Sequence, residues 1–332
     1  MNKPKLIILD DYEGELAKAP AMTRLRELAD VTILNQPLTP ADDPLLRETD
    51  YLIALRERTQ LDRAFFARCP NLKLLLQTGG HAYHVDQEAA TAQGVIIALG
   101  RSQTTKPPIV VPELVFALLL GLIRQIYPLH KQMQQGAWPQ LIGGSLHGRT
   151  LGILGYGRHG KPVARLAEAF GMQVIAWGRT TTGDNAVGTI DEYGVARVPL
   201  DELLACADVV SVHLRLSESS KQLLGYAEFK AMKPTAILIN TSRGALIDEA
   251  ALIRALQEGE IAGAGLDVFA VEPLDASSPL RTLPNVLLTP HVGWQVQDVL
   301  HEFMAIATTQ LEAWLAGQLP LAEVLNPQLL KI

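Results

Sequence analysis

The hydrophobic residues of this chain fall into short continuous runs that are separated by amphipathic stretches. In the first part of the chain, three amphipathic stretches predict helices near residues 22–29, 61–68 and 86–93. Continuous apolar runs are typical of parallel strands covered on both faces, and their alternation with helices indicates an α/β fold. The runs that predict strands are 5–9, 31–34, 51–55, 72–76 and 95–99.

A cluster of prolines, Pro107, Pro108 and Pro112, marks the end of this first alternation. One long apolar helix is predicted after it, over residues 113–135. A second alternation of strands and helices follows, and a last helix is predicted over 296–315. The second set of predicted strands, which matches a complete dinucleotide-binding sheet, is 150–154, 173–177, 209–214, 236–240, 263–268 and 285–289.

Composition excludes several classes of protein. The 332 residues suffice for two domains, and the net charge of −6 gives no support for a nucleic-acid partner. The longest apolar stretch, 109–123, contains Pro112 and Glu113 and is too short for a membrane span, so we expect a buried helix and no membrane partner. Cys69 and Cys206 show no paired spacing, which favours a reduced, cytoplasmic setting.

A glycine-rich turn joins the strand at 150–154 to a helical pattern. In this context the motif G-x-G-x-x-G predicts binding of a dinucleotide, whereas alone it is often just a turn. The first glycine permits the tight turn, the second lets the backbone approach the pyrophosphate, and the third lets the helix pack on the strand. The helix N-terminus then offers free amides to the phosphates. The turn consists of Gly155, Tyr156, Gly157, Arg158, His159 and Gly160.

The end of the next strand bears on the choice between NAD and NADP. An NAD site normally has an acid there to accept the ribose hydroxyls, but this chain has Gly178, and the nearest acid is Asp184. Arg179 and Thr180 are suited to a 2′-phosphate, which favours NADP. The alternative is that Arg179 lies in solvent or stacks on adenine, in which case either cofactor is accepted.

Three polar residues follow predicted strands of the second alternation: Arg243, Glu272 and His291. Ligands of a doubly wound sheet bind outside the carboxyl ends of its strands, so we expect these side chains at one crevice. A histidine takes or gives the proton of a hydroxyl as hydride moves, a carboxylate orients the imidazole, and an arginine grips a substrate carboxylate. Each residue alone has an ordinary structural explanation; together they indicate oxidation of a 2-hydroxy acid or reduction of a 2-keto acid.

With these motifs the chain resembles the D-isomer-specific 2-hydroxyacid dehydrogenase family. The matching segments are LGILGYGRHG, VVSVHL, INTSRGALIDEAAL, GLDVFAVEPL and LTPHVGW, which span residues 150–294 in order. The N-terminal half fits more loosely, through NLKLLLQTGGHAYHVDQEAATAQGV and VPELVFALLLGLIR.

The resemblance implies a role for each matching residue. Arg243 corresponds to the substrate-binding arginine, Glu272 to the acid partner and His291 to the acid–base histidine. The further residues that it assigns to the cofactor are His213, Thr241 and Asp267, and those that it assigns to the substrate carboxylate are Gly79, Gly80 and His81. Arg56 and Arg58 end a strand of the first domain, where they either reach a second anionic group or form a solvated pair.

The family fold also implies the domain organisation. Two Rossmann-like or flavodoxin-like domains are expected, with the NAD(P)-binding domain, 104–295, inserted into a discontinuous substrate domain, 1–103 plus 296–332. Closure of the cleft between them would exclude water from hydride transfer. The resemblance further implies a homodimer, for which the apolar helix from Val111 and the loop near Trp138 are the candidate contacts; burial of the helix in its own core is the alternative.

Other functions remain open at this point. A dinucleotide-sensing binding protein of the co-repressor type and a phosphite-type dehydrogenase are the alternatives, whereas formate enzymes carry glutamine where Glu272 stands. Among 2-hydroxy acids, a glyoxylate- or hydroxypyruvate-like substrate is our expectation. D-3-phosphoglycerate would need a basic pocket, which Arg56, Arg58 or Arg101 would have to supply.

Overall fold

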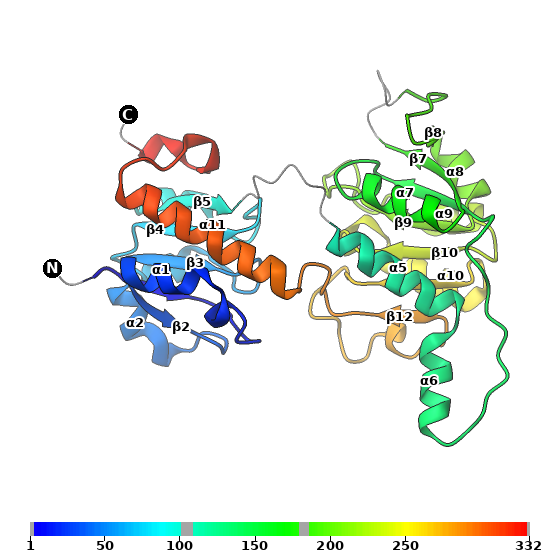
Figure 1. Cartoon of the computed structure of the whole chain (residues 1–332), viewed down its shortest axis with the longest axis horizontal. Coiled ribbons are helices and arrows are strands. Elements are labelled where there is room, and N and C mark those ends of the chain that lie inside the picture. The colour runs from blue at the N-terminus through cyan, green and yellow to red at the C-terminus, as the bar shows by residue number, and fades with distance from the viewer. Residues whose placement is uncertain (1–2, 101–108, 179–185, 331–332) are drawn as a thin grey trace. The chain divides into compact units, whose positions relative to one another are not determined.

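The computed structural model describes residues 3–100, 109–178 and 186–330. The chain divides into two compact units, Met1–Thr105 with Gln295–Ile332 (unit 1) and Lys106–Trp294 (unit 2). Both units are α/β structures built on parallel sheets, as the sequence predicts (Figure 1).

Unit 1 contains a parallel sheet with the strand order β2-β1-β3-β4-β5. This is the flavodoxin-like order, in which the chain reverses direction between β1 and β3. Leu6 pairs with Val31 on one side and with Tyr51 on the other, so β1 lies between β2 and β3. The strands are β1 (Lys5–Ile8), β2 (Asp30–Ile33), β3 (Tyr51–Ala54), β4 (Leu74–Thr78) and β5 (Ile96–Gly100).

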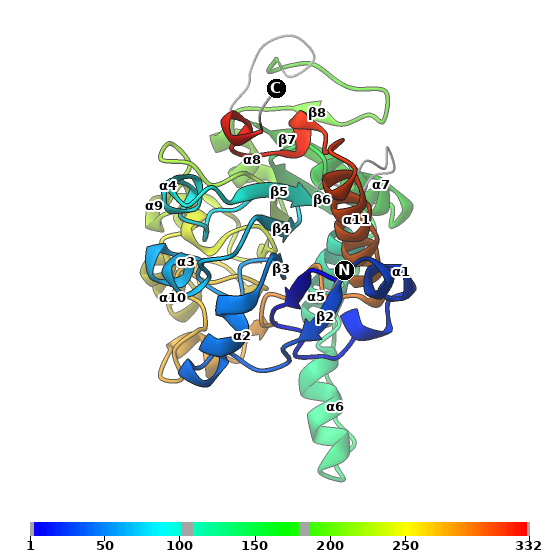
Figure 2. The same cartoon turned by 90° about the vertical axis from the view of Figure 1, so that its left-hand side faces the viewer.

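Helices cover both faces of this sheet (Figure 2). α1 (Ala21–Leu28) and α11 (Gln297–Leu315) lie on one face, and the other is covered by α2 (Asp43–Glu48), α3 (Arg63–Arg68) and α4 (Gln87–Ala92). Asp62 and Asp86 accept backbone N–H groups at the starts of α3 and α4 and so define where these helices begin. Short 3-10 turns complete the unit: Leu16–Lys18, Pro40–Asp42, Leu321–Glu323 and Pro327–Leu329.

Unit 2 contains a seven-stranded parallel sheet in the order β12-β11-β10-β9-β6-β7-β8. The predicted strands are all present. The structure adds β8, which was not predicted because a strand of two residues shows no apolar run in the sequence. The chain leaves β6 for β7 and β8 and then returns to β9, so its direction reverses between β6 and β9. The strands are β6 (Thr150–Leu154), β7 (Gln173–Trp177), β8 (Ala196–Arg197), β9 (Val209–Val212), β10 (Ile237–Asn240), β11 (Gly263–Leu266) and β12 (Val286–Leu288).

The helices of unit 2 pack on both faces of this sheet and enclose two apolar cores. α5 supplies Val115, Phe116, Leu118 and Leu119 to the core that contains β6. The helices are α5 (Val110–Ile123), α6 (Ile126–Gln134), α7 (Gly160–Ala169), α8 (Leu200–Cys206), α9 (Tyr226–Ala231) and α10 (Glu249–Glu258), with 3-10 turns at Gly244–Leu246 and Pro279–Arg281.

The prediction of one helix over 113–135 is wrong, because the chain bends by 64° between α5 and α6. Gln125 has φ +54, in the left-handed region, and separates the two helices. The N–H of Gly144 donates to the carbonyl of Ile123 at 2.7 Å, so the returning segment ends α5 by taking an acceptor of its last turn. α5 is mostly buried, whereas α6 has no buried residue.

Among the described residues, no single helix has the length and apolar character to cross a membrane. α5 and α6 pass such a test only as a bent pair, by length and composition alone. The buried side chains of α5 belong to the core of unit 2, so that core accounts for their apolar character.

Candidate functional site

The turn between β6 and α7 has the geometry that its three glycines predict. Gly155 has φ +98, and a Cβ there would lie 2.8 Å from the carbonyl carbon of His213 at the end of β9. A Cβ on Gly160 would clash with the carbonyl oxygen of Gly155, whereas a Cβ on Gly157 would meet nothing within 4 Å. The first and third glycines are therefore required by close packing, and the second leaves an open approach to the backbone.

The surroundings of this turn fit a dinucleotide. Nδ1 of His159 and Oγ1 of Thr241 are buried without a hydrogen-bond partner among the described residues. Buried polar atoms are rarely left unsatisfied, so orphans at the carboxyl edge of the sheet suit a polar ligand. α7 begins at Gly160 and directs the amides of its first turn towards the same edge. These residues fit the pyrophosphate and ribose of a nicotinamide dinucleotide.

His213 lies where the sheet reverses direction, directly after β9. Its Nε2 lies 2.8 Å from Oγ of Ser211, which fixes the ring. Burial, with a smaller contribution from nearby His159, lowers the pKa of His213 to about 3. Burial also lowers the pKa of His159, with the charges of Arg158 and Arg243 acting in the same direction. Both imidazoles are thus neutral near pH 7 and can donate or accept one hydrogen bond at each nitrogen without adding charge.

Sequence reasoning missed a clamp on the residue between the first two glycines. The hydroxyl of Tyr156 donates to Asp191 at 2.7 Å, and the guanidinium of Arg197 lies 4.0 Å from the centre of the Tyr156 ring. Asp191 also accepts the backbone N–H groups of Tyr193 and Val195. The phosphate turn is therefore tied to the segment before β8. The sequence gives no sign of these contacts, because Tyr156 lies far from Asp191 and Arg197 in the chain and no motif with a defined spacing joins them.

The end of β7 is open at Gly178. A Cβ on Gly178 would meet nothing within 4 Å, so this position leaves room beside the sheet. Arg179 and Thr180, the predicted partners of a 2′-phosphate, lie outside the described residues, as does Asp184.

Arg243 follows β10 in a turn held by buried polar groups. The side chain of Asn240 donates to the carbonyl of Arg243 at 3.0 Å and accepts the N–H of Ser242 at 3.0 Å. A Cβ on Gly244 would overlap the backbone of Phe269. Only glycine therefore allows the Arg243 turn to approach the loop after β11, which carries Glu272.

Glu272 and His291 form a direct pair. Oε2 of Glu272 lies 2.6 Å from Nδ1 of His291, and Oε1 accepts the backbone N–H of Phe269 at 2.9 Å. The two side chains are 34% and 28% exposed, so the pair is accessible on unit 2. The Nε2 edge of the imidazole is the one turned away from the acid.

The electrostatic state of Glu272 follows from opposing effects. Burial acts to raise its pKa, but hydrogen bonds from His291 and Phe269 and the charges of His291 and Arg243 together lower it below its usual value of 4.5. Glu272 is thus a carboxylate near pH 7 and accepts a hydrogen bond from Nδ1–H of His291.

Asp267 holds the turn on which His291 lies. It is 1% exposed and accepts hydrogen bonds from the Thr289 hydroxyl at 2.6 Å and from the N–H groups of Val292 and Gly293 at 2.8 and 2.9 Å. His291 itself has φ +55 and donates its N–H to the carbonyl of Asp267. The position of Asp267 near the carboxamide of the nicotinamide stays a prediction. In the structure, Asp267 holds the turn of His291 in place through these hydrogen bonds.

The residues that the resemblance assigns to the substrate carboxylate lie in unit 1, after β4. Gly79 has φ +86, and His81 stacks on Tyr83 with ring centres 4.8 Å apart. The interpretation of Arg56 and Arg58 as a solvated pair is wrong, because their side chains are only 14% and 12% exposed. Each contacts a carboxylate of its own, Glu57 and Glu13.

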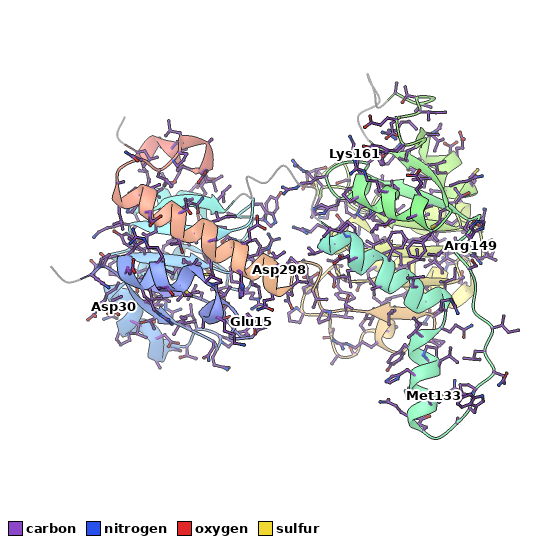
Figure 3. All side chains as sticks on the ribbon, viewed as in Figure 1. Glu15, Asp30, Met133, Arg149, Lys161 and Asp298 are labelled. Atoms are coloured by element: carbon purple, nitrogen blue, oxygen red, sulfur yellow. The ribbon has the colours of Figure 1, made fainter. Side chains whose placement is uncertain are left out.

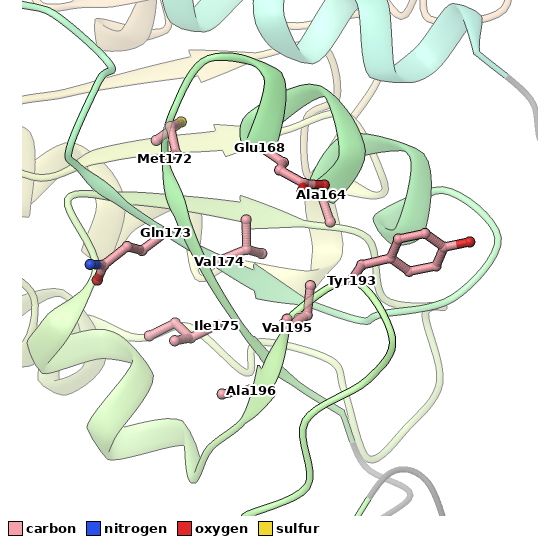
Figure 4. Close-up of a pocket in the computed structure, with 10 residues that line it drawn as sticks. Ala164, Glu168, Met172, Gln173, Val174, Ile175, Tyr193, Val195 and Ala196 are labelled. Atoms are coloured by element: carbon pink, nitrogen blue, oxygen red, sulfur yellow. The ribbon is translucent and has the colours of Figure 1, made fainter.

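A pocket of about 300 Å³ in unit 2 contains none of the predicted site residues. Figure 4 shows its walls on α7, β7 and the segment before β8, where Val174, Ile175 and Val195 form an apolar surface beside Glu168 and Tyr193. Within the described ranges, no group of three or more histidine, cysteine, aspartate or glutamate side chains is placed to hold a metal ion.

Comparison with known proteins identifies the family. Residues 116–293 match the family model described as D-isomer specific 2-hydroxyacid dehydrogenase, NAD binding domain. A glyoxylate reductase of Thermococcus litoralis is 34% identical over 89% of this chain and 90% of its own length. A glycerate dehydrogenase of Methylorubrum extorquens is 34% identical over 80% of this chain and 83% of its own. A solved structure, described as a putative D-3-phosphoglycerate dehydrogenase from Ralstonia solanacearum, covers 99% of this chain and 98% of its own at 32% identity with a TM-score of 0.88.

These findings confirm the predicted fold, the dependence on a nicotinamide dinucleotide and the activity as an oxidoreductase on CH–OH groups. They support the dehydrogenase interpretation and not the sensing-protein or phosphite alternatives. This chain belongs to the D-isomer-specific 2-hydroxyacid dehydrogenase family.

Proposed function

We propose that this protein reduces a small 2-keto acid, either glyoxylate to glycolate or hydroxypyruvate to D-glycerate. The observation that carries the proposal is the 2.6 Å pair of Glu272 and His291 at the carboxyl edge of a dinucleotide-type sheet, with Arg243 on the turn that packs against the Glu272 loop. Relatives named glyoxylate reductase and glycerate dehydrogenase support the choice of substrate.

Each member of the trio has a distinct task in this reaction. When bound, the reduced nicotinamide supplies the hydride that reduces C2 of the keto acid. Arg243 pairs with the substrate carboxylate and polarises the keto oxygen. His291 gives the proton from Nε2 to that oxygen, while Glu272 holds Nδ1–H and stabilises the imidazolium before transfer. In the oxidative direction His291 takes the same proton back.

D-3-phosphoglycerate is a weaker candidate than these short acids. Its phosphate requires a basic pocket, but both terminal nitrogens of Arg58 donate to Glu13, at 2.7 and 2.6 Å. An arginine that binds one carboxylate in this bidentate way has little capacity left for a phosphate. Arg56 is paired with Glu57, whose Oε2 lies 3.4 Å from its Nε, and Arg101 lies outside the described residues.

The test is an assay of NAD(P)H oxidation with a panel of 2-keto acids. We expect turnover with glyoxylate and hydroxypyruvate, and much lower kcat/KM with phosphohydroxypyruvate. The absence of turnover with either short acid would refute the proposed substrate, and a preference for phosphohydroxypyruvate would establish the phosphoglycerate reaction instead.

For the cofactor, we propose a preference for NADPH over NADH. Gly178 stands where an NAD site carries an acid, and Arg179 and Thr180 follow it in the sequence. Titration of the tryptophan fluorescence with both cofactors should give the tighter Kd for NADPH, and Arg179→Ala should weaken NADPH without weakening NADH. Equal weakening of both would mean that Arg179 does not contact the phosphate.

We also propose a homodimer that uses α6 and the segment after it. The apolar side chains of α5 are largely buried in their own unit, but Trp138 and Ile142 are 79% and 93% exposed. Met133 on α6, labelled in Figure 3, belongs to the same exposed set. Exposed apolar patches of this kind are typical of protein contacts. A second copy of the chain is the occupant that the family resemblance favours.

Sedimentation velocity tests this proposal. The wild-type protein should sediment as a dimer, and Ile142→Asp should shift it to a monomer. The control is Ile190→Asp, which changes another exposed isoleucine of unit 2, at 68% exposure, and should leave the dimer intact. A monomeric wild-type protein would remove the proposal.

We place the protein in the cytoplasm. Cys69 and Cys206 are free thiols, one buried and one exposed, as expected in a reducing compartment. Fractionation of cells that produce the tagged protein tests this; recovery with secreted or membrane fractions would contradict it.

A further inference from the structure

Arg56 occupies a strained backbone position at the carboxyl edge of the unit 1 sheet. It follows β3 and has φ +56, in the left-handed region that arginine rarely adopts. Its N–H donates to Oγ1 of Thr78 at 2.8 Å, and its carbonyl accepts Nε2 of Gln77 at 2.9 Å. Both partners are buried and belong to β4. A strained residue that its neighbours hold this firmly is a candidate for function.

The side chain of Arg56 lies across the loop after β4. A Cβ on Gly79 would overlap Nη1 of Arg56, so glycine is needed for the guanidinium to rest there. This loop follows the carboxyl end of a parallel strand, the edge at which sheets of this order bind ligands. A ligand held by the amides of Gly79 and Gly80 therefore meets Arg56 directly.

A carboxylate accompanies the guanidinium at this place. Oε2 of Glu57 lies 3.4 Å from Nε of Arg56, and Oε1 lies 3.1 Å from Nε2 of His81. Nη2 of Arg56 lies 3.2 Å from the same nitrogen of His81. The three side chains form one cluster, and Glu57 cancels the charge of Arg56 within it.

The proposed function supplies the chemical setting, and the next step rests on it. All 2-keto acids share one carboxylate, which needs one cationic or amide-rich site. A second anionic group on the substrate would meet the carboxylate of Glu57 beside the loop after β4. Like charges in a partly buried site discriminate between ligands of similar size. His81 can exchange a hydrogen bond with a hydroxyl instead.

We infer that Glu57 is a specificity residue which restricts the enzyme to 2-keto acids whose tail is hydrogen or a neutral hydroxyl-bearing group, and excludes those with a second anionic group. Glu57 acts by neutralising Arg56 over Gly79. Removal of its charge converts the same place into a site for a second anion.

The experiment compares hydroxypyruvate with oxaloacetate, a dicarboxylate, in steady-state assays with saturating cofactor. In Glu57→Gln the ratio of kcat/KM for oxaloacetate to that for hydroxypyruvate should rise about tenfold or more, because one charge is removed at close range. Glu57→Ala removes the same charge and should give the same change. The double variant Glu57→Gln with Arg56→Gln should lose the gain.

The matched control is Glu27→Gln, which removes the carboxylate partner of Arg24 on α1, away from the Arg56 cluster, and should leave the ratio unchanged. An equal rise in this control would show a general field effect and overturn the role of the Arg56 contact. An unchanged ratio in both Glu57 variants, with hydroxypyruvate turnover retained, would overturn the inference and leave the proposed function standing. Failure of the wild-type enzyme on every keto acid would instead refute the proposed function.

Discussion

The two sheets present charged side chains at their carboxyl edges in different ways. In unit 1 the charges hold one another: Arg58 binds Glu13, and the cluster of Arg56, Glu57 and His81 shares its contacts. In unit 2 the backbone does much of the holding, because Asp267 and Asn240 bind N–H and carbonyl groups of the turns that carry His291 and Arg243.

This difference suggests that the unit 1 residues determine substrate specificity, whereas the unit 2 residues determine the rate of the reaction. The paired charges of unit 1 determine the electrostatic potential that a substrate meets there. Substitutions of these residues should therefore alter which substrate is accepted. Side chains on turns fixed through their backbones keep their reactive atoms available, and changes there alter the rate. The experiments below test this division, from the largest expected effect to the smallest.

His291→Ala should lower kcat by about two to four orders of magnitude, the usual contribution of general acid–base catalysis. The reason is the loss of the group that transfers the proton. The Kd of the cofactor, measured by fluorescence titration, should remain near that of the wild type. Near-normal turnover would show that another group is the acid–base.

Asp267→Asn should destabilise the protein by about 1–3 kcal/mol, because the amide nitrogen faces N–H groups that need an acceptor. Urea unfolding measures the change, and kcat should fall with it as the His291 turn loosens. The control Thr289→Val removes only one hydroxyl donor and should cost about 1 kcal/mol. Equal stability of the Asp267 variant and wild type would mean that the turn does not depend on this carboxylate.

Tyr12→Phe is the counterpart at the edge of unit 1. The Tyr12 hydroxyl donates to buried Asp10 at 2.7 Å, so its loss should cost about 0.5–1.5 kcal/mol in urea unfolding. Asp10 keeps the hydroxyl of Thr59 as a donor, which limits the effect. The kcat should stay as in the wild type. A large fall in kcat would contradict the view that residues at the edge of the unit 1 sheet do not determine the rate.

Glu272→Gln should change the pH dependence of stability. The folded-state pKa of Glu272 is lowered, so its contribution to stability is present above its ordinary value of 4.5 and is lost as the pH falls through the folded-state pKa. The free energy of unfolding should therefore decline less steeply in the variant than in the wild type as the pH falls below about 5. Parallel profiles would mean that the pair with His291 does not lower the pKa.

The strands and the phosphate turn could be predicted because their signals are local. The apolar run that forms β6 and the glycines at 155, 157 and 160 determine the local backbone conformation by themselves. His291 could be found because it follows the end of a recognisable strand. The break between α5 and α6 was missed because it depends on Gly144, which returns from beyond α6 to the end of α5. The clamp of Asp191 on Tyr156 and the pairing of Arg58 with Glu13 likewise join distant segments.

The placement of α11 has a consequence for how the protein is made. This helix, from the end of the chain, packs on β4, β5 and α1, and it buries Leu300, Met304 and Leu311. During synthesis the first five strands leave the ribosome long before α11, whereas all the elements of unit 2 precede it. Until α11 is made, α1 is the one helix that the described residues place on that face of the unit 1 sheet, and the surface that α11 covers on β4 and β5 stays exposed while unit 2 can already fold. The part of the chain that is translated first is therefore completed last.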